Sequence, residues 1–200
     1  MWFLFPGYIM TGKPNTRKCG TMNRILDAAK DEFADKGFAG ARVDVIAARA
    51  GVNKAALYYH IGDKDALYAE AIHDVIGAAA GRLKEGLRDS MSPEDKIRMY
   101  LKTLTSTFDE NPQIPRIMMR ELASGGENIP KVFFEDLLSI FKTLSGIIEE
   151  GKKKGVFIDT LPFMVHFMAI GATVVYKSIA PILAKFSDSQ LKGLSGEVSG

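Results

Sequence analysis

Apolar residues recur every three or four positions along most of the chain. Ile25, Ala29 and Phe33 follow one another at intervals of four within residues 21–36, which places them on one face of an α-helix. No segment alternates apolar and polar residues for long enough to predict a strand, so the predicted fold class is all-α. The same helical spacing predicts further helices over residues 43–50, 54–60 and 64–88, from Ser92-Pro93 onward, between Asn111-Pro112 and Gly125-Gly126, and over residues 130–154 and 160–185.

The two short helices near the N-terminus have the spacing of a helix-turn-helix. Gly51 interrupts the pattern after residues 43–50, and glycine accepts the backbone geometry that a tight turn needs. Asn53 can then cap the helix over residues 54–60 with its side-chain oxygen. Leu57 is the inward anchor of that second helix, so its opposite face is expected to be exposed.

That exposed face carries small and polar-tipped side chains. Ala55 and Ala56 are small enough to lie close to base edges in a DNA major groove. The hydroxyls of Tyr58 and Tyr59 can donate to phosphate oxygens, although either tyrosine alone could instead pack in the core. Lys64 adds a donor in the first turn of the next helix, where the helix dipole favours an anion. The candidate DNA contacts of this surface are Lys54, Ala55, Ala56, Tyr58, Tyr59, His60 and Lys64.

Charge is unevenly divided along the chain, although the net charge is only +2. Residues 11–64 hold ten Lys and Arg against six Asp and Glu, whereas residues 65–200 hold sixteen against eighteen. A basic front part suits a polyanionic partner, and a slightly acidic remainder indicates a second task. The charge pattern therefore agrees with double-stranded DNA as the partner of the front part.

The residues that catalysis or metal binding would need are sparse. Cys19 is the only cysteine, and the three histidines stand far apart, at His60, His73 and His166. The sequence has no H-E-x-x-H, no G-x-S-x-G and no glycine-rich phosphate loop. We therefore expect neither an enzyme nor a bound metal or cofactor. A single cysteine cannot form an internal disulfide, which fits a reducing cytoplasm.

Residues 1–20 are predicted to be a flexible extension. Their first ten residues, MWFLFPGYIM, are apolar, but they lack a basic region and a cleavage site, and a membrane-spanning helix needs roughly 20 residues. We expect no membrane segment; an interfacial anchor or an overlong start are the alternatives for this stretch. Lys13, Arg17 and Lys18 either form an arm on DNA phosphates or in the minor groove, or remain solvated.

Residues 21–68 contain several short patterns in a fixed order. The segment reads TMNRILDAAKDEFADKGFAGARVDVIAARAGVNKAALYYHIGDKDALY, with DAA…F…KGF first, V-x-x-IA-x-x-AGV next and K-x-x-LYYH-x-x-x-K-x-x-L last. This set resembles the DNA-binding domain of the TetR family of transcriptional regulators. One departure is Arg42, which stands where relatives usually have Ser or Thr. The resemblance implies a phosphate contact there, which Arg42 would make by charge, and a weaker helix cap.

The resemblance also implies a division of labour along the chain. Residues 1–20 would be the extension, residues 21–66 the DNA-binding domain and residues 67–200 a helical effector-binding and dimerisation domain. The family's homodimers pair through their last two long helices, here residues 130–154 and 160–185, although intramolecular packing would need the same apolar residues. The implied function is a repressor that leaves a pseudo-palindromic operator when a small-molecule effector binds. The alternatives are an activator, or a protein-interaction module that retains the helix-turn-helix as a scaffold.

The helices after residue 67 are rich in aromatic and methionine side chains, which adapt to varied ligands. Such side chains at helical spacing also build ordinary cores, so the sequence leaves both roles open. Glu121 and His166 are the polar residues most expected to face inward, and a buried acid would favour a cationic ligand. The candidate pocket residues are Tyr100, Phe108, Met118, Met119, Glu121, Phe141, Phe163, His166 and Phe167.

Overall fold

The computed structural model describes the backbone of residues 16–185 and the side chains of residues 20–185. No strand occurs in that range, so the all-α prediction is confirmed. The segment MWFLFPGYIM, Lys13 and the side chains of Arg17, Lys18 and Cys19 lie outside what is described. The helices are α1 (Thr16–Gly40), α2 (Val43–Ala50), α3 (Lys54–Ile61), α4 (Lys64–Gly86), α5 (Pro93–Glu110), α6 (Gln113–Ala123), α7 (Lys131–Lys153) and α8 (Pro162–Leu183).

The first helix differs from its prediction at the start and agrees with it near the end. α1 begins at Thr16, inside the segment predicted as an extension, rather than near residue 21. It departs from helical geometry at Gly37, where φ is 70° and ψ is 174°. Side chains with a Cβ rarely adopt this φ, so glycine lets the regular helix stop at the predicted position.

The turn between α2 and α3 forms as the sequence indicates. Gly51 adopts left-handed geometry, with φ 67° and ψ 36°. The Oδ1 atom of Asn53 accepts a hydrogen bond from the backbone N–H of Ala56 at 2.6 Å, which caps α3. Leu57 is completely buried. α2, in contrast, begins after Arg42 without any side-chain hydrogen bond to its first amides, as the weaker cap predicts.

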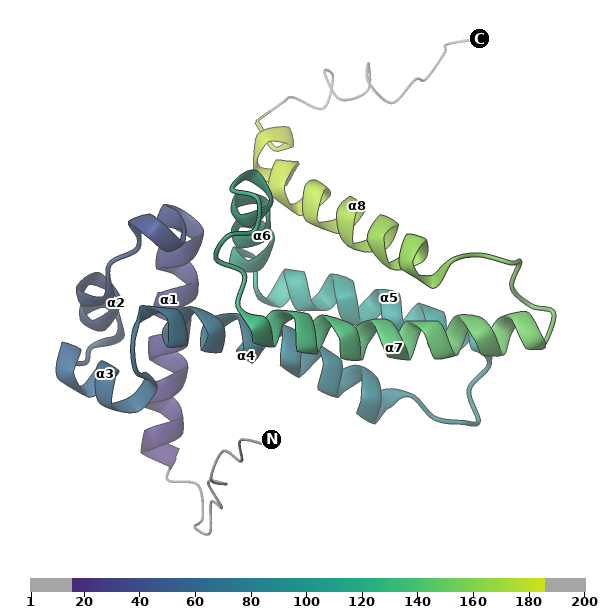
Figure 1. Cartoon of the computed structure of the whole chain (residues 1–200), viewed down its shortest axis with the longest axis horizontal. Helices are drawn as coiled ribbons and strands as arrows, with labels where there is room; N and C mark the ends of the chain where they lie inside the picture. The colour runs from purple at the N-terminus through teal and green to yellow at the C-terminus, as the bar shows by residue number, and fades with distance from the viewer. Residues whose placement is uncertain (1–15, 186–200) are drawn as a thin grey trace, which may run out of the picture.

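The helices form a small domain and a larger bundle that share one helix (Figure 1). α1, α2 and α3 pack together at one end of the molecule, and α4 runs from them into the bundle of α5–α8. α4 packs most extensively against α7, and α6 lies against both α1 and α8. The two domains are therefore connected through α4 and also through α6.

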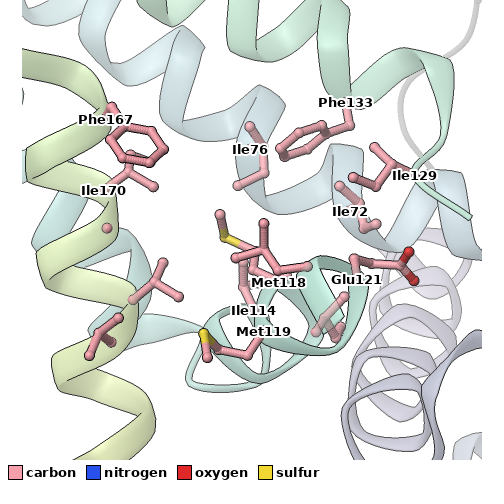
Figure 2. Close-up of a pocket in the computed structure, with 15 residues that line it drawn as sticks. Ile72, Ile76, Ile114, Met118, Met119, Glu121, Ile129, Phe133, Phe167 and Ile170 are labelled. Atoms are coloured by element: carbon pink, nitrogen blue, oxygen red, sulfur yellow. The ribbon is translucent and has the colours of Figure 1, made fainter. Parts of the chain in front are cut away.

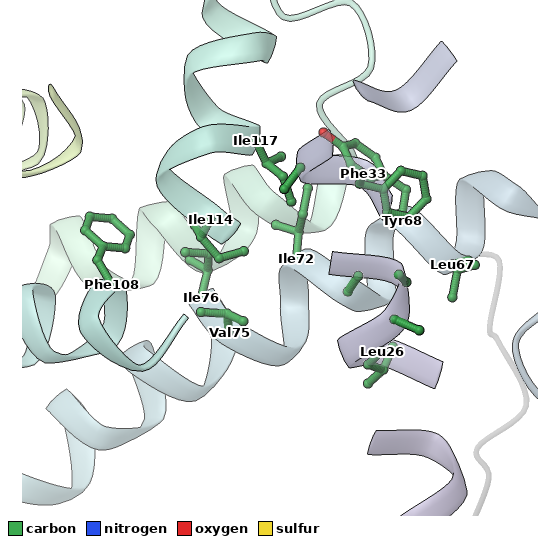
Figure 3. Close-up of a cluster of buried hydrophobic side chains, with 14 of the residues drawn as sticks. Leu26, Phe33, Leu67, Tyr68, Ile72, Val75, Ile76, Phe108, Ile114 and Ile117 are labelled. Carbon is green, nitrogen blue, oxygen red and sulfur yellow. The ribbon is translucent and has the colours of Figure 1, made fainter. Parts of the chain in front are cut away.

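Buried side chains continue without a break from the small domain into the bundle (Figure 3). Phe33 of α1 meets Tyr68 of α4 edge to face, with ring centroids 4.7 Å apart. Phe38 lies 5.1 Å from the same tyrosine ring. Ile72 and Ile76 extend the cluster along α4 toward α6. Because cores are close-packed, a shift of α4 relative to α1 must disturb this cluster.

Polar contacts fasten α6 to the last regular turn of α1. The guanidinium of Arg120 donates to the backbone oxygens of Ala34 and Asp35, at 2.9 and 2.7 Å. Arg116 donates to the carboxylate of Asp35 at 2.7 Å. These bonds lie just before Gly37, where α1 changes direction. The end of α1 therefore follows the position of α6.

α8 is the one helix of residues 16–185 that is long and apolar enough, by length and composition, to cross a membrane. It nevertheless packs against α5, α6 and α7, and its Lys177 forms an ion pair with Asp109 of α5. Its other face is exposed and includes Met168, Val175 and Tyr176. An exposed apolar face of this kind marks a contact surface for a further protein or for lipid.

Candidate nucleic-acid interface and ligand cavity

The predicted outward face of α3 is exposed in the structure. Tyr59 is 86% exposed and Tyr58 is 42% exposed, directly beside fully buried Leu57. Lys54, Ala55 and His60 are exposed as well, and Ala56 is half-buried under the Asn53 cap. The ring of His60 lies edge to face against that of Tyr59, with centroids 5.5 Å apart. This face carries aromatic hydroxyls, an imidazole and an ammonium group with no core function.

Three of the candidate side chains that carry a positive charge already have partners within the chain, and one of them is Lys54, whose ammonium group lies 5.7 Å from the centroid of the Tyr58 ring. Arg42 forms a two-point ion pair with Asp44, with nitrogen–oxygen distances of 2.7 and 3.2 Å. This pairing raises the pKa of Arg42 and lowers that of Asp44. The ammonium group of Lys64 donates to the backbone oxygen of Ala39 at 3.2 Å and lies 4.9 Å from the centroid of the Phe38 ring. Arg42 and Lys64 must exchange these partners in order to contact a phosphate.

A cavity of about 480 Å³ lies between α4, α6, α7 and α8 (Figure 2). Ile72 and Ile76 of α4 form one wall, and Phe167 and Ile170 of α8 face them across the cavity. Its volume is in the range of small-molecule sites. Of the predicted residues, Met118, Met119, Glu121 and Phe167 line it. Residues that were not predicted for it include Ile72, Ile76, Ile114, Ile117, Leu122, Ile129, Phe133, Ile170, Gly171, Val174 and Val175.

A second cavity, of about 180 Å³, lies deeper in the bundle. It brings together six of the predicted residues, Tyr100, Phe108, Met118, Phe163, His166 and Phe167. The hydroxyl of Tyr100 and the Nδ1 atom of His166 are hydrogen-bonded at 2.6 Å. Burial raises the pKa of the tyrosine and lowers that of the histidine. Both side chains are therefore uncharged near neutral pH.

Phe141 is the predicted pocket residue that lines neither cavity. Its ring instead packs from outside against two residues of the second cavity, Phe163 and His166, with centroids 6.4 and 6.2 Å away. Six of the eleven unpredicted residues of the first cavity are isoleucines, and four of these six belong to α4 and α6. Their spacing is the same as that of core residues, so it contained no separate signal of a cavity.

Glu121 connects the first cavity to the small domain. Its side chain is buried at the cavity wall, but the carboxylate is turned toward α1 (Figure 2). It accepts hydrogen bonds from the hydroxyl of Tyr68 at 2.8 Å and from the backbone N–H of Asn128 at 3.3 Å. Burial and this carboxylate raise the pKa of Tyr68 well above its ordinary value. The tyrosine in turn packs against Phe33 of α1.

The described part of the chain has exposed apolar faces but no cluster of metal ligands. Within residues 20–185, no group of three or more His, Cys, Asp or Glu side chains is placed to hold a metal ion. The outer faces of α7 and α8 instead present apolar side chains to solvent, among them Phe134, Leu138, Met168 and Tyr176. Phe134 and Leu138 add an exposed apolar face on α7 to the one described for α8.

Comparison with known proteins agrees with this division into two parts. The family model of bacterial regulatory proteins of the tetR family matches residues 25–71. The model of the tetracyclin repressor-like C-terminal domain matches residues 93–193. The first match covers the helix-turn-helix and the start of α4, and the second covers α5–α8, which line the cavities together with α4.

Individual relatives extend over nearly the whole chain. The HTH-type transcriptional regulator RutR of Escherichia coli O157:H7 is 28% identical over 182 residues, which cover 91% of this chain and 85% of RutR. The HTH-type transcriptional repressor SCO4008 of Streptomyces coelicolor is 28% identical over 184 residues, which cover 89% and 91%. The crystal structure of a HlyIIR mutant protein superposes with a TM-score of 0.65 at 26% identity, and covers 85% of this chain and 91% of that one.

The helix-turn-helix geometry, the helical bundle behind it and the two ordered matches all lead to one assignment. The second match alone includes half of the chain. The chain belongs to the tetR family of bacterial regulatory proteins and is a DNA-binding transcriptional regulator.

Proposed function

We propose that the protein is a homodimeric repressor that binds a pseudo-palindromic operator through α3 of each protomer and is released by a small-molecule effector. The exposed face of α3 is the observation that carries this proposal. Tyr58 and Tyr59 lie on a short helix that packs inward through Leu57 and Ile61, so the two tyrosines are available to a partner. The repressor SCO4008, which is similar over most of its length, supports repression rather than activation.

The DNA contacts follow from the chemistry of this face. Ala55 and Ala56 lie in the first turn of α3, where a recognition helix meets base edges. We assign Tyr58, Tyr59 and His60 to phosphate oxygens, because their polar tips lie at the C-terminal end of α3. We also assign Lys54, Arg42 and Lys64 to phosphate oxygens. Arg42 and Lys64 would first have to release their present partners within the chain.

The exposed apolar faces of α7 and α8 support a dimer. One helix-turn-helix contacts a single half-site, and two copies related by a two-fold axis contact half-sites one turn of DNA apart. A second copy on Phe134, Leu138, Met168 and Tyr176 would remove these exposed side chains from water. The interface would also cover the apolar face that makes α8 comparable in composition to a membrane helix.

The contacts between α6 and α1 support control of DNA binding by the cavity. Met118 and Glu121 of α6 line the first cavity, and Arg120 of the same helix holds the end of α1. An effector that displaces α6 would therefore move α1 and, with it, α2, which packs against both α1 and the recognition helix α3. A shift of the population from 99:1 to 1:99 requires a preference of about 5.5 kcal/mol for the non-binding state.

Selection of bound fragments from a genomic DNA pool, followed by gel shifts, tests the proposal. The wild-type protein should retain specific fragments, and the variant Tyr59→Ala/Lys64→Ala should lose them while its circular dichroism spectrum and unfolding curve stay close to wild type. Lys84→Ala, at an exposed lysine near the end of α4, is the matched control and should bind like wild type. A double variant that still binds the fragments with full affinity would contradict the assignment of α3.

A reporter assay and the DNA selection together distinguish a repressor from the two alternatives, an activator and a protein-interaction module. Deletion of a repressor raises expression from the selected promoter, and deletion of an activator lowers it. An interaction module that merely retains the helix-turn-helix would select no DNA fragment. In the proposed function the protein acts in the cytoplasm without enzymatic activity and without a metal or cofactor. Its relatives are named as transcriptional regulators.

A further inference from the structure

The two cavities are neighbours that share a wall. Ile76, Met118, Phe133, Phe167 and Ile170 line both of them. Three of the five are aromatic or methionine side chains, and methionine has several rotatable bonds with which it adapts to an occupant. The first cavity lies between α4, α6, α7 and α8 (Figure 2), and the second has Tyr100 and His166 in its wall. The two cavities therefore adjoin along a wall of adaptable side chains, and a ligand that displaces Met118 would occupy both as one elongated apolar site.

The interior of this site offers no partner to a charged group. Neither cavity is lined by a lysine or an arginine, so an anion would be buried without an opposite charge. The one lining carboxylate belongs to Glu121, and it is turned away from the cavity toward Tyr68 and the Asn128 amide, which already donate to it (Figure 2). Burying a charge without a partner is strongly unfavourable. This geometry argues against the cationic ligand that a buried acid would favour.

The inner end of this site, the second cavity, is lined by four polar side chains, Tyr100, Thr103, Thr107 and His166. The Thr107 hydroxyl is already bonded to Arg82 and to the Thr103 carbonyl. The Nδ1 atom of His166 is bonded to the hydroxyl of Tyr100, and its Nε2 atom has no hydrogen-bond partner among residues 20–185. A neutral imidazole presents one donor or one acceptor at that nitrogen, depending on the tautomer. A single polar group on an otherwise apolar ligand would therefore have one partner at this end.

We propose that the effector is an uncharged, elongated, mainly hydrocarbon molecule whose one hydroxyl or carbonyl group is hydrogen-bonded to Nε2 of His166. This inference rests on the proposed function, because it names the ligand class of the same cavity. Ile76 and Phe133 would contact the hydrocarbon part along its length, since they line both cavities.

A set of three ten-carbon probes tests the charge of the ligand. 1-Decanol, decanoate and decylammonium have the same chain and differ in the charge of one end. Titration calorimetry of the full-length protein at pH 7.5 should show that 1-decanol binds at least about tenfold more tightly than either ion, a difference of about 1.4 kcal/mol. Binding of either ion as tight as that of the alcohol, or no binding of the alcohol, would overturn the proposal.

Variants at the inner end test the role of His166. Because His166→Phe alone leaves the Tyr100 hydroxyl without its partner, the double variant Tyr100→Phe/His166→Phe is used, which keeps an aromatic ring at both positions and removes the whole polar pair. It should bind 1-decanol about fivefold more weakly, the loss expected for one hydrogen bond. His73→Phe, the same substitution at a histidine outside both cavities, should leave the affinity unchanged. Unchanged affinity in the double variant would overturn the assignment of His166.

Gel shifts with the selected operator fragments, in the same samples, separate this inference from the proposed function. If the protein binds the fragments but does not prefer the alcohol, the ligand class is wrong and the DNA-binding regulator stands. If the alcohol binds with the expected preference but releases no DNA, the ligand class is supported and the effector role in the proposed function is wrong.

Discussion

The small domain and the bundle use tyrosine in opposite ways. Tyr58 and Tyr59 lie on α3, and both are exposed, Tyr59 almost fully and Tyr58 in part. Tyr68 and Tyr100 are almost completely buried, and each hydroxyl is bonded to a buried polar side chain, Glu121 or His166. A buried hydroxyl must be paired, because an unpaired one costs free energy, whereas an exposed hydroxyl can exchange water for a phosphate oxygen. The buried tyrosines, Tyr68 and Tyr100, therefore stabilise the fold, whereas the hydroxyls of Tyr58 and Tyr59 are available to bind a partner.

The two regions also differ in how tightly they are packed. In the small domain, small residues such as Ala47 and Ala50 let α2 approach its neighbours closely, and both are buried. In the bundle, α4, α5, α6, α7 and α8 surround cavities of about 480 and 180 Å³. A DNA-binding domain must hold a fixed shape, whereas a ligand site needs space that the packed side chains leave unfilled.

The largest expected effect concerns the exposed tyrosines and their lysine neighbour. The double variant Lys54→Ala/Tyr59→Ala should lower operator affinity by about 100-fold, because a dimer loses each contact twice, while the free energy of unfolding changes by less than about 0.5 kcal/mol. Gel shifts at several salt concentrations should also show a slope of log affinity against log salt that is smaller by about two. A salt dependence equal to that of wild type would place Lys54 away from the phosphates.

The second prediction applies one substitution to both kinds of tyrosine. Tyr68→Phe should lower the free energy of unfolding by about 1–3 kcal/mol, because the buried carboxylate of Glu121 loses a hydrogen bond. Tyr58→Phe should change it by less than about 0.5 kcal/mol, because its hydroxyl is not needed by the fold. Urea denaturation of the two variants measures the difference, and equal effects would remove the distinction between the two regions.

The third prediction compares the packing of the two regions. Ala47→Leu, in buried α2, should cost about 1–3 kcal/mol of stability through overpacking. Ala79→Leu, at the wall of the second cavity, should cost less than about 1 kcal/mol, because the added carbons can enter existing space. Thermal and urea unfolding measure both changes. A larger loss for Ala79→Leu would mean that the cavity cannot accept the added side chain.

The smallest expected effect depends on pH. The hydrogen bond between His73 of α4 and Asp136 of α7, 2.7 Å long, raises the pKa of the histidine, with smaller contributions from the charges of Asp136, Glu70 and Asp74. The pair therefore stabilises the fold below the unfolded histidine pKa of about 6.5 and loses this effect as pH rises through the higher folded value. Since the His73 side chain is nearly half exposed, screening limits the contribution to less than about 1 kcal/mol.

The variant Asp136→Asn measures that contribution. The difference in melting temperature between wild type and variant should be present at pH 5.5 and should shrink by pH 8.5. A difference that stays constant over this range would assign the effect of Asp136 to packing rather than to the charge of His73.

The sequence alone determined where most of the helices lie and how the helix-turn-helix is built. Gly51, Asn53 and Leu57 specify a turn, a cap and an inward anchor within a few residues of one another, and the structure forms all three. Such features depend on backbone geometry and on neighbours close in the chain, so spacing is sufficient to predict them. The exposure of Tyr59 followed from the same local argument.

Only the tertiary structure decided which apolar residues surround space and which polar groups meet. Phe133 lines both cavities and Phe141, eight residues later on the same helix, lines neither, although both have the spacing of an inward face. Glu121 bonds to Tyr68, which is 53 residues away in the sequence, and Lys64 bonds to the Ala39 carbonyl. The physical reason is that a helical stripe of apolar residues fixes a direction but not a distance. The angles and separations at which helices pack determine whether that direction ends in a close-packed core, in a cavity or on another helix.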